Sequence, residues 1–380
     1  MSLASRLAIA ALLLAPLTAS AAPPVAEKPR AIDLVVCLDV SGSMNGLIDS
    51  AKIKLWDIVN ELARVKPTPN LRVALYSYGN PAYGQASGYV RKEIDLTTDL
   101  DEVYAKLNAL RISGGEEYVA RVTQTGLKEQ KWADEVGALK VVFVCGNEPA
   151  DQDKQVPLAE VAEMARKQGV IVNTIHCGPD DAGWREFAVK CGGSYTTIDQ
   201  DRAKRDLTTA IKSPFDTELV KLGEKLNTTY VAFGAAGERG AANQLAQDRA
   251  AGAAAPAAEV ARAVTKANAL YKNSAWDLID CLKDNPKLDV TKMKPEELPE
   301  EMRKLKPEER VAFLKKKGEE RAAIQKEINE LSAKRAKFVE EERKKLPKTD
   351  SEKALDEALK GIIREQAKAK GFEVPAAEKK

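Results

Sequence analysis

Short apolar runs alternate regularly with amphipathic stretches between residues 31 and 213. Runs such as 31–38 and 139–145 are almost continuously apolar, which is typical of strands buried on both faces of a sheet. In the stretch 47–62 apolar residues recur at three- and four-residue spacing, as on one face of a helix. The pattern predicts an α/β fold in which helices cover both faces of a doubly wound, mainly parallel sheet.

The sequence pattern indicates the bounds of the individual strands and helices in this region. Strands are expected over residues 31–38, 71–78, 89–96, 139–145, 170–176 and 194–198. The third of these is more polar, as an edge strand would be. Asp99 can cap the helix that follows it, Gly169 is expected to end the helix 158–168, and a closing helix is expected over 206–211.

Strand signals nearly vanish after residue 213. Residues 234–258 are rich in Ala and Gly, so the stretch 214–258 is expected to contain a partly flexible connector or a weak helix interrupted at Pro256. Residues 259–380 are expected to form a charged α-helical region. Its segment 308–346 carries an apolar stripe in register for only about two heptads, which favours an antiparallel helical hairpin over a long coiled coil. A last amphipathic helix is expected over 354–370.

The N-terminus predicts export. Arg6 precedes a short apolar run, and Ala19-Ser20-Ala21 is a small-residue cleavage pattern, so residues 1–21 are expected to be a signal peptide. The run is short for a stable membrane span, which needs about 20 residues. A buried N-terminal helix is the alternative. The expected mature chain begins near Ala22 and is periplasmic or secreted.

Composition excludes several function classes. The net charge is +2 and aromatic residues make up 5%, which argues against a nucleic-acid partner. His176 is the only histidine, so a multi-histidine metal site is excluded. Five cysteines occur without a CxxC pair, and Cys177 and Cys191 are expected to remain unpaired.

One short motif contains the residues that are the best candidates for a binding site. The first strand ends in Asp39-Val-Ser41-Gly-Ser43, which places a carboxylate and two hydroxyls at the carboxyl end of a central strand. Hard oxygen donors of this kind suit Mg²⁺ or Mn²⁺. The alternative is that the hydroxyls only cap the following helix.

Through this motif and the order of its elements, the segment 31–213 resembles a von Willebrand factor A domain. The resemblance implies a metal-ion-dependent adhesion site (MIDAS) that includes Asp39, Ser41 and Ser43. Two positions depart from the family pattern. Glu116 falls at the usual threonine ligand, and Asn147 aligns with the usual aspartate. The resemblance therefore implies a metal site of Asp39, Ser41, Ser43, Glu116 and Asn147, with Asp151 close enough to substitute.

Catalytic alternatives are weaker. His176 lies on the same rim as the two serines, but a serine–histidine pair needs an orienting acid, so an ordinary hydrogen-bonded rim residue is favoured. Glu116 and Glu117 could form a carboxylate pair, yet adjacent residues at a helix start face different directions. Favourable charge at a helix N-terminus accounts for them equally well.

The leading hypothesis is an exported, non-enzymatic module that binds a protein partner. A MIDAS-like site holding Mg²⁺ or Mn²⁺ would recognise an acidic residue of that partner. The alternative is a metal-free scaffold whose helical tail mediates assembly in the cell envelope. A third hypothesis, a metal-assisted hydrolase using Ser43 or His176, lacks a complete set of nucleophile, base and orienting group.

Overall fold

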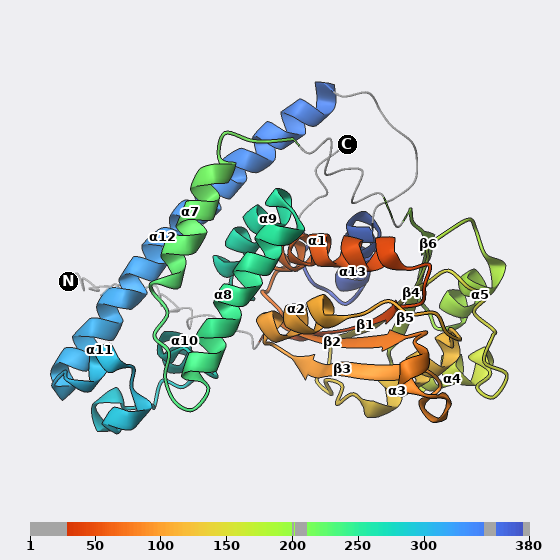
Figure 1. The fold of residues 1–380 in the computed structure, drawn as a ribbon, viewed down its shortest axis with the longest axis horizontal. Helices are drawn as coiled ribbons and strands as arrows, with labels where there is room; N and C mark the ends of the chain where they lie inside the picture. Colours follow the sequence, from red (N-terminus) through yellow and green to blue (C-terminus); the bar gives the residue numbers. More distant parts are fainter. Residues whose placement is uncertain (1–28, 200, 202–210, 346–354, 375–380) are drawn as a thin grey trace, which may run out of the picture.

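A computed structural model describes residues 29–199, 201, 211–345 and 355–374. Its centre is a six-stranded sheet in the order β3-β2-β1-β4-β5-β6 (Figure 1). The strands are β1 (Ala31–Asp39), β2 (Asn70–Tyr78), β3 (Val90–Thr97), β4 (Leu139–Gly146), β5 (Ile171–His176) and β6 (Tyr195–Thr197). Every pairing is parallel except β2 with β3, which is antiparallel and leaves β3 at an edge. The predicted fold class is confirmed.

The register of the sheet brings the strand ends to one edge. Asp39 at the end of β1 pairs with Tyr78 at the end of β2. On its other side, Leu38 pairs with Cys145 of β4. Gly146 in turn pairs with His176 at the end of β5. The loops that follow four strands therefore leave from the same edge, which is where ligands bind in open α/β sheets.

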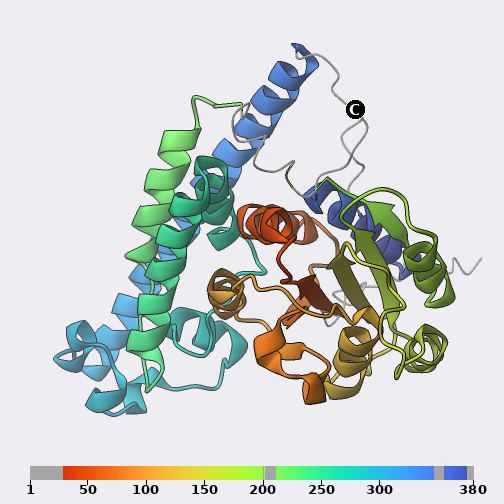
Figure 2. The same ribbon diagram turned by 45° about the vertical axis from the view of Figure 1, so that its right-hand side comes forward.

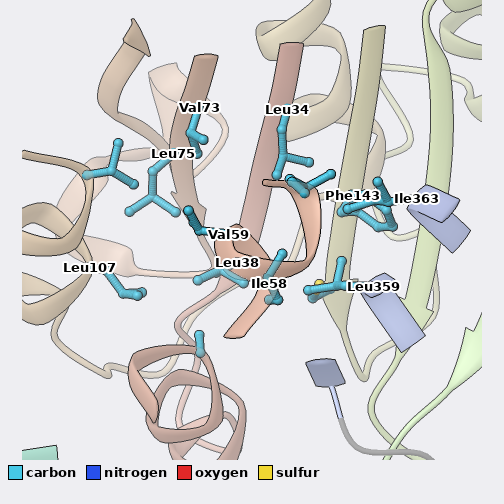
Figure 3. Close-up of a cluster of buried hydrophobic side chains, with 14 of the residues drawn as sticks. Leu34, Leu38, Ile58, Val59, Val73, Leu75, Leu107, Phe143, Leu359 and Ile363 are labelled. Atoms are coloured by element: carbon cyan, nitrogen blue, oxygen red, sulfur yellow. The ribbon is translucent and has the colours of Figure 1, made fainter. Parts of the chain in front are cut away.

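Alternating side chains of the strands enter two separate cores. Leu34 and Leu38 pack with Val59 of helix α1 (Asn45–Leu62) on one face, as Figure 3 shows. Helix α2 (Leu100–Ala109) adds Leu107 to the same cluster. The opposite face, with Val35 and Cys37, is covered by α3 (Val119–Glu129), α4 (Leu158–Gln168) and α5 (Ala182–Lys190). Strands buried on both faces explain the continuous apolar runs.

The predicted helix ends are also observed. The Asp99 carboxylate accepts hydrogen bonds from the backbone N–H groups of Asp101 and Glu102, so Asp99 caps α2. Gly169 ends α4 with φ +63°, in the left-handed region that favours glycine. The closing helix expected over 206–211 falls largely outside the described residues.

The stretch 214–258 forms packed helices rather than an unstructured connector. It contains α7 (Asp216–Asn227) and α8 (Gly237–Ala254), and α9 begins at Pro256 and ends at Lys266. The break at Pro256 agrees with the alternative of an interrupted helix, because proline lacks the N–H that would continue α8 but suits the first turn of α9. Helices α7 and α9 approach closely, since a Cβ on Gly223 would lie 2.8 Å from the Cβ of Ala263.

Helix α12 (Pro307–Lys345) is continuous over 39 residues, so the prediction of an antiparallel hairpin within this segment is wrong. Its apolar stripe packs on α7 and α9, where Ile324 and Ile328 meet Leu222 and Val260. Figures 1 and 2 both show α7 lying along α12. The shorter helices α10 (Leu278–Asp284) and α11 (Glu300–Arg303) pack near the start of α12, where Leu278 and Met302 share a cluster with Leu314 (Figure 1). The limited register of the stripe thus reflects packing against two other helices of the same chain.

The helical region is not separate from the sheet. The last helix, α13 (Leu355–Ala369), lies on the same face of the sheet as α1, and its Leu359 and Ile363 join Phe143 of β4 in the core (Figure 3). Helix α9 also packs on α1. The chain therefore leaves the sheet domain after β6 and returns to it at its end, so the predicted division at residue 213 does not separate two independent cores.

The five cysteines are all buried and none forms a disulfide. No helix in the described part of the chain combines the length and apolar character that a membrane crossing would need.

Candidate metal centre

The candidate site begins where β1 ends. Asp39 is completely buried, and its Oδ1 accepts a hydrogen bond from the backbone N–H of Ser41 at 2.7 Å. The hydroxyl oxygens of Ser41 and Ser43 lie 3.3 Å apart. Ser43 also donates to Oδ1 of Asn147 at 3.3 Å. The structure thus brings four of the five predicted ligands together, from the loops that follow β1 and β4.

The fifth position is occupied differently from the prediction. Glu116 is exposed, whereas Glu117 is 7% exposed and its carboxyl group lies against that of Asp39. The residue that faces the site is therefore Glu117 rather than Glu116. Because α3 begins only at Val119, Glu116 and Glu117 precede the helix and do not form its start as predicted. In the non-helical backbone before it, adjacent side chains face opposite ways, one to solvent and one inward.

Two glycines make room for the carboxylate pair. Gly79, with φ +84°, follows β2, and a Cβ there would lie 2.8 Å from Asp39 Oδ1 and 3.2 Å from Cγ of Glu117. Gly146 ends β4, and a Cβ there would lie 3.1 Å from Asp39 Oδ2. Glycine directly after a buried strand was the signal in the sequence that the backbone passes close to the site.

The carboxylates are held in an environment that disfavours their charge. Asp39 Oδ2 and Glu117 Oε2 are both buried and have no hydrogen-bond partner. Burial raises the pKa of Asp39, against hydrogen bonds from Glu117 and Ser41 that lower it. Burial and the adjacent Asp39 raise the pKa of Glu117 to about 9. The nearby Glu148 carboxylate raises the pKa of both groups.

The donor set fits a hard divalent cation. Two buried carboxylate oxygens without partners would each gain from a positive charge. Two hydroxyls and the side-chain oxygen of Asn147 supply further neutral oxygen ligands, as Mg²⁺ and Mn²⁺ prefer. Within the described residues, no group of three or more His, Cys, Asp or Glu side chains is placed to hold a metal. The fit therefore depends on the serine and amide oxygens together with the carboxylates.

Asp151, the possible substitute ligand, is exposed. Its carboxylate accepts a hydrogen bond from Nζ of Lys154 at 2.9 Å. The ion pair holds Asp151 on the surface, so Asn147 is the residue of this loop that reaches the site.

His176 supports the loop instead of acting on the serines. Its Nε2 lies 3.0 Å from the carbonyl oxygen of Asn147, and its Nδ1 lies 2.7 Å from that of Pro179. Since each ring nitrogen lies against a backbone carbonyl oxygen, the ring is not oriented as a base for Ser41 or Ser43. The position agrees with the predicted role of a hydrogen-bonded rim residue.

Residues 33–238 match the sequence model described as the von Willebrand factor type A domain. The chain belongs to this family. The match begins in β1, includes all residues of the candidate site and continues to the start of α8. No match was found among curated proteins.

Two solved structures are among those similar to this VWA domain. One is proximal thread matrix protein 1 from the mussel byssus with a zinc-occupied MIDAS motif, at 15% identity and a TM-score of 0.37, covering 47% of this chain and 44% of that one. Another is the SpRpn10 VWA domain, at 15% identity and a TM-score of 0.37, covering 48% of this chain and 96% of that one. The match thus spans less than half of the mussel protein.

Proposed function

We propose that this protein is an exported, non-enzymatic binding module whose VWA domain uses a MIDAS-like divalent-metal site to recognise an acidic residue of a protein partner. The observation that supports the proposal is the buried Asp39 carboxylate, whose Oδ2 has no hydrogen-bond partner, together with the hydroxyl and amide oxygens of Ser41, Ser43 and Asn147 that the loops after β1 and β4 bring together. VWA domains are generally interaction modules, and a structure of the mussel relative has zinc at this motif.

The residues have distinct roles in this proposal. Ser41, Ser43 and Asn147 would hold the ion together with the carboxylates, while the Ser41 N–H keeps Asp39 Oδ1 fixed. When bound, Mg²⁺ or Mn²⁺ would attract a carboxylate oxygen of the partner. A catalytic role is not supported by the site, because the only histidine is engaged by two backbone carbonyls.

The metal site can be tested by calorimetric titration of Mg²⁺ and Mn²⁺ into residues 22–380. Saturable binding is expected in the wild type and in Asp151→Asn, a matched rim variant, and is expected to be lost in Asp39→Asn. Equal binding by Asp39→Asn and the wild type would refute the site. If no protein binds either ion, the metal-free scaffold becomes the better hypothesis, and the helical region becomes the place to look for partners.

Export is proposed from the N-terminal pattern alone, which lies outside the described residues. Intact-mass measurement of the protein recovered from an exporting host is expected to show a chain that begins at Ala22. A full-length chain retained in the cytoplasm would contradict this part of the proposal.

A further inference from the structure

Glu117 is held in the metal centre by backbone contacts on both sides. Its N–H donates to Oε1 of Gln152, in the loop after β4, at 3.2 Å. Two residues earlier, the backbone of Gly115 lies close to Gly79, the residue that follows β2. A Cβ on Gly115 would lie 2.7 Å from the carbonyl oxygen of Gly79. This close packing fixes the path of the loop and directs the Glu117 side chain inward.

The described contacts satisfy the Glu117 carboxyl group only in part. It forms hydrogen bonds with Asp39 and Ser41, but the residue is only 7% exposed and its Oε2 has neither a hydrogen-bond donor nor a cation. Its nearest charged neighbour is another carboxylate, that of Asp39. Burying a carboxylate oxygen without a partner costs free energy, and the packing of the loop alone would not offset that cost. A cation bound between the two carboxylates would satisfy both.

We propose that Glu117 is a resident carboxylate ligand of the ion, and that it occupies the coordination position that an acidic partner residue takes over. This inference rests on the proposed function, since it assumes that the site holds a divalent ion. In such a site the protein's own Glu117 carboxylate binds the ion, and partner binding replaces it with a carboxylate of the partner.

Charge explains why an exchange is favoured over simple addition. A divalent ion with the carboxylates of Asp39 and Glu117 has no net charge, and Glu148 nearby adds repulsion. A further carboxylate would then gain little Coulomb energy. If the partner's carboxylate replaces that of Glu117, the charge at the ion is unchanged, and the glutamate moves into solvent next to the exposed Glu116.

The experiment is chemical rescue of Mn²⁺ binding, measured by calorimetry in the presence and absence of acetate at matched ionic strength. Glu117→Ala is expected to weaken Mn²⁺ binding by about tenfold or more, because a ligand is lost. Acetate is expected to restore most of this loss, since it can fill the vacated position. The wild type, which already has its carboxylate, is expected not to respond to acetate. Glu116→Ala is the control and is expected to bind as the wild type does.

The outcomes separate this inference from the proposed function. Unchanged binding by Glu117→Ala, with binding lost in Asp39→Asn, would overturn the inference alone. Weakened binding without acetate rescue would show a ligand that cannot be exchanged, which also overturns it. No binding by the wild type would overturn both. If Glu117→Ala does not fold, as judged by circular dichroism, the isosteric Glu117→Gln replaces it, and unchanged Mn²⁺ affinity there would count against the inference.

Discussion

Gln366 in the last helix and Asn173 in strand β5 exchange two amide hydrogen bonds across 193 residues of sequence. The Gln366 Nε2 donates to Asn173 Oδ1 at 2.7 Å, and the Asn173 Nδ2 donates to Gln366 Oε1 at 3.1 Å. Both side chains are buried, and Asn173 also accepts from the N–H of Ser194. This pair holds α13 against the sheet and so joins the C-terminal end of the described chain to the sheet domain.

Gln366→Ala is expected to lower the free energy of unfolding by about 1–3 kcal/mol, because it leaves the Asn173 amide buried without its partner. The measurement is urea unfolding of the wild type, Gln366→Ala, Asn173→Ala and the double variant. A coupling energy above about 0.5 kcal/mol is expected, as for residues in direct contact. Strict additivity of the two single losses would contradict the docking role.

A second contact, at Arg262, joins the helical region to the sheet domain. Its guanidinium is fully buried in α9, pairs with Asp101 of α2 at 2.6 Å and with Asp248 at 2.9 Å, and lies 4.5 Å from the ring centroid of Trp56. Arg262→Met is expected to cost about 3–5 kcal/mol in chemical unfolding, because it leaves the Asp101 carboxylate buried without its charge partner. The control Lys167→Ala removes an exposed pair with Glu163 and is expected to cost about 0.5 kcal/mol or less. Similar losses of unfolding free energy in both variants would contradict the expectation that the buried ion pair contributes more than the exposed one.

Gly79→Ala is expected to damage both stability and metal binding. The residue has φ +84°, where a side chain is strained, and the new methyl would lie 2.8 Å from Asp39 Oδ1. A loss of about 1–3 kcal/mol in unfolding free energy is expected, with weaker Mn²⁺ binding by calorimetry. Gly42→Ala, in the adjacent loop, has nothing within 4 Å of its Cβ and is expected to change stability by about 0.5 kcal/mol or less. Equal effects of the two variants would mean that Gly79 does not shape the site.

The buried Lys266 is expected to make the free energy of unfolding depend on pH. Burial lowers its pKa to about 8, against Asp248, which raises it. Because the folded pKa is below that of an unfolded lysine, the unfolded chain holds more protons between about pH 8 and pH 10.5. The contribution of Lys266 to stability should therefore rise with pH across this window and stay constant below it. Urea unfolding of the wild type and Lys266→Met at several pH values tests this. A difference between the two proteins that does not change from pH 7 to pH 10 would contradict it.

Local pattern was sufficient for the sheet and for part of the site. Continuous apolar runs specify strands buried on both faces, and Asp39, Ser41 and Ser43 are close in sequence, so the turn that follows β1 is enough to bring them together. Asn147 was implied by the resemblance to the family, and the parallel pairing of β1 with β4 brings the ends of these two strands to a common edge. The strands and the first three site residues depended on periodicity and short-range geometry alone.

The packing of the whole chain determined which glutamate faces the candidate metal centre and where the helices after residue 213 lie. Glu116 and Glu117 have the same chemistry and differ by one position, so the choice depended on how the loop packs against Gly79 and Gln152. The return of α13 to the sheet likewise depends on residues far apart in sequence, such as Asn173 and Gln366. A sequence pattern shows that a helix has an apolar face, but the surface that covers this face is selected by the packing of the whole chain.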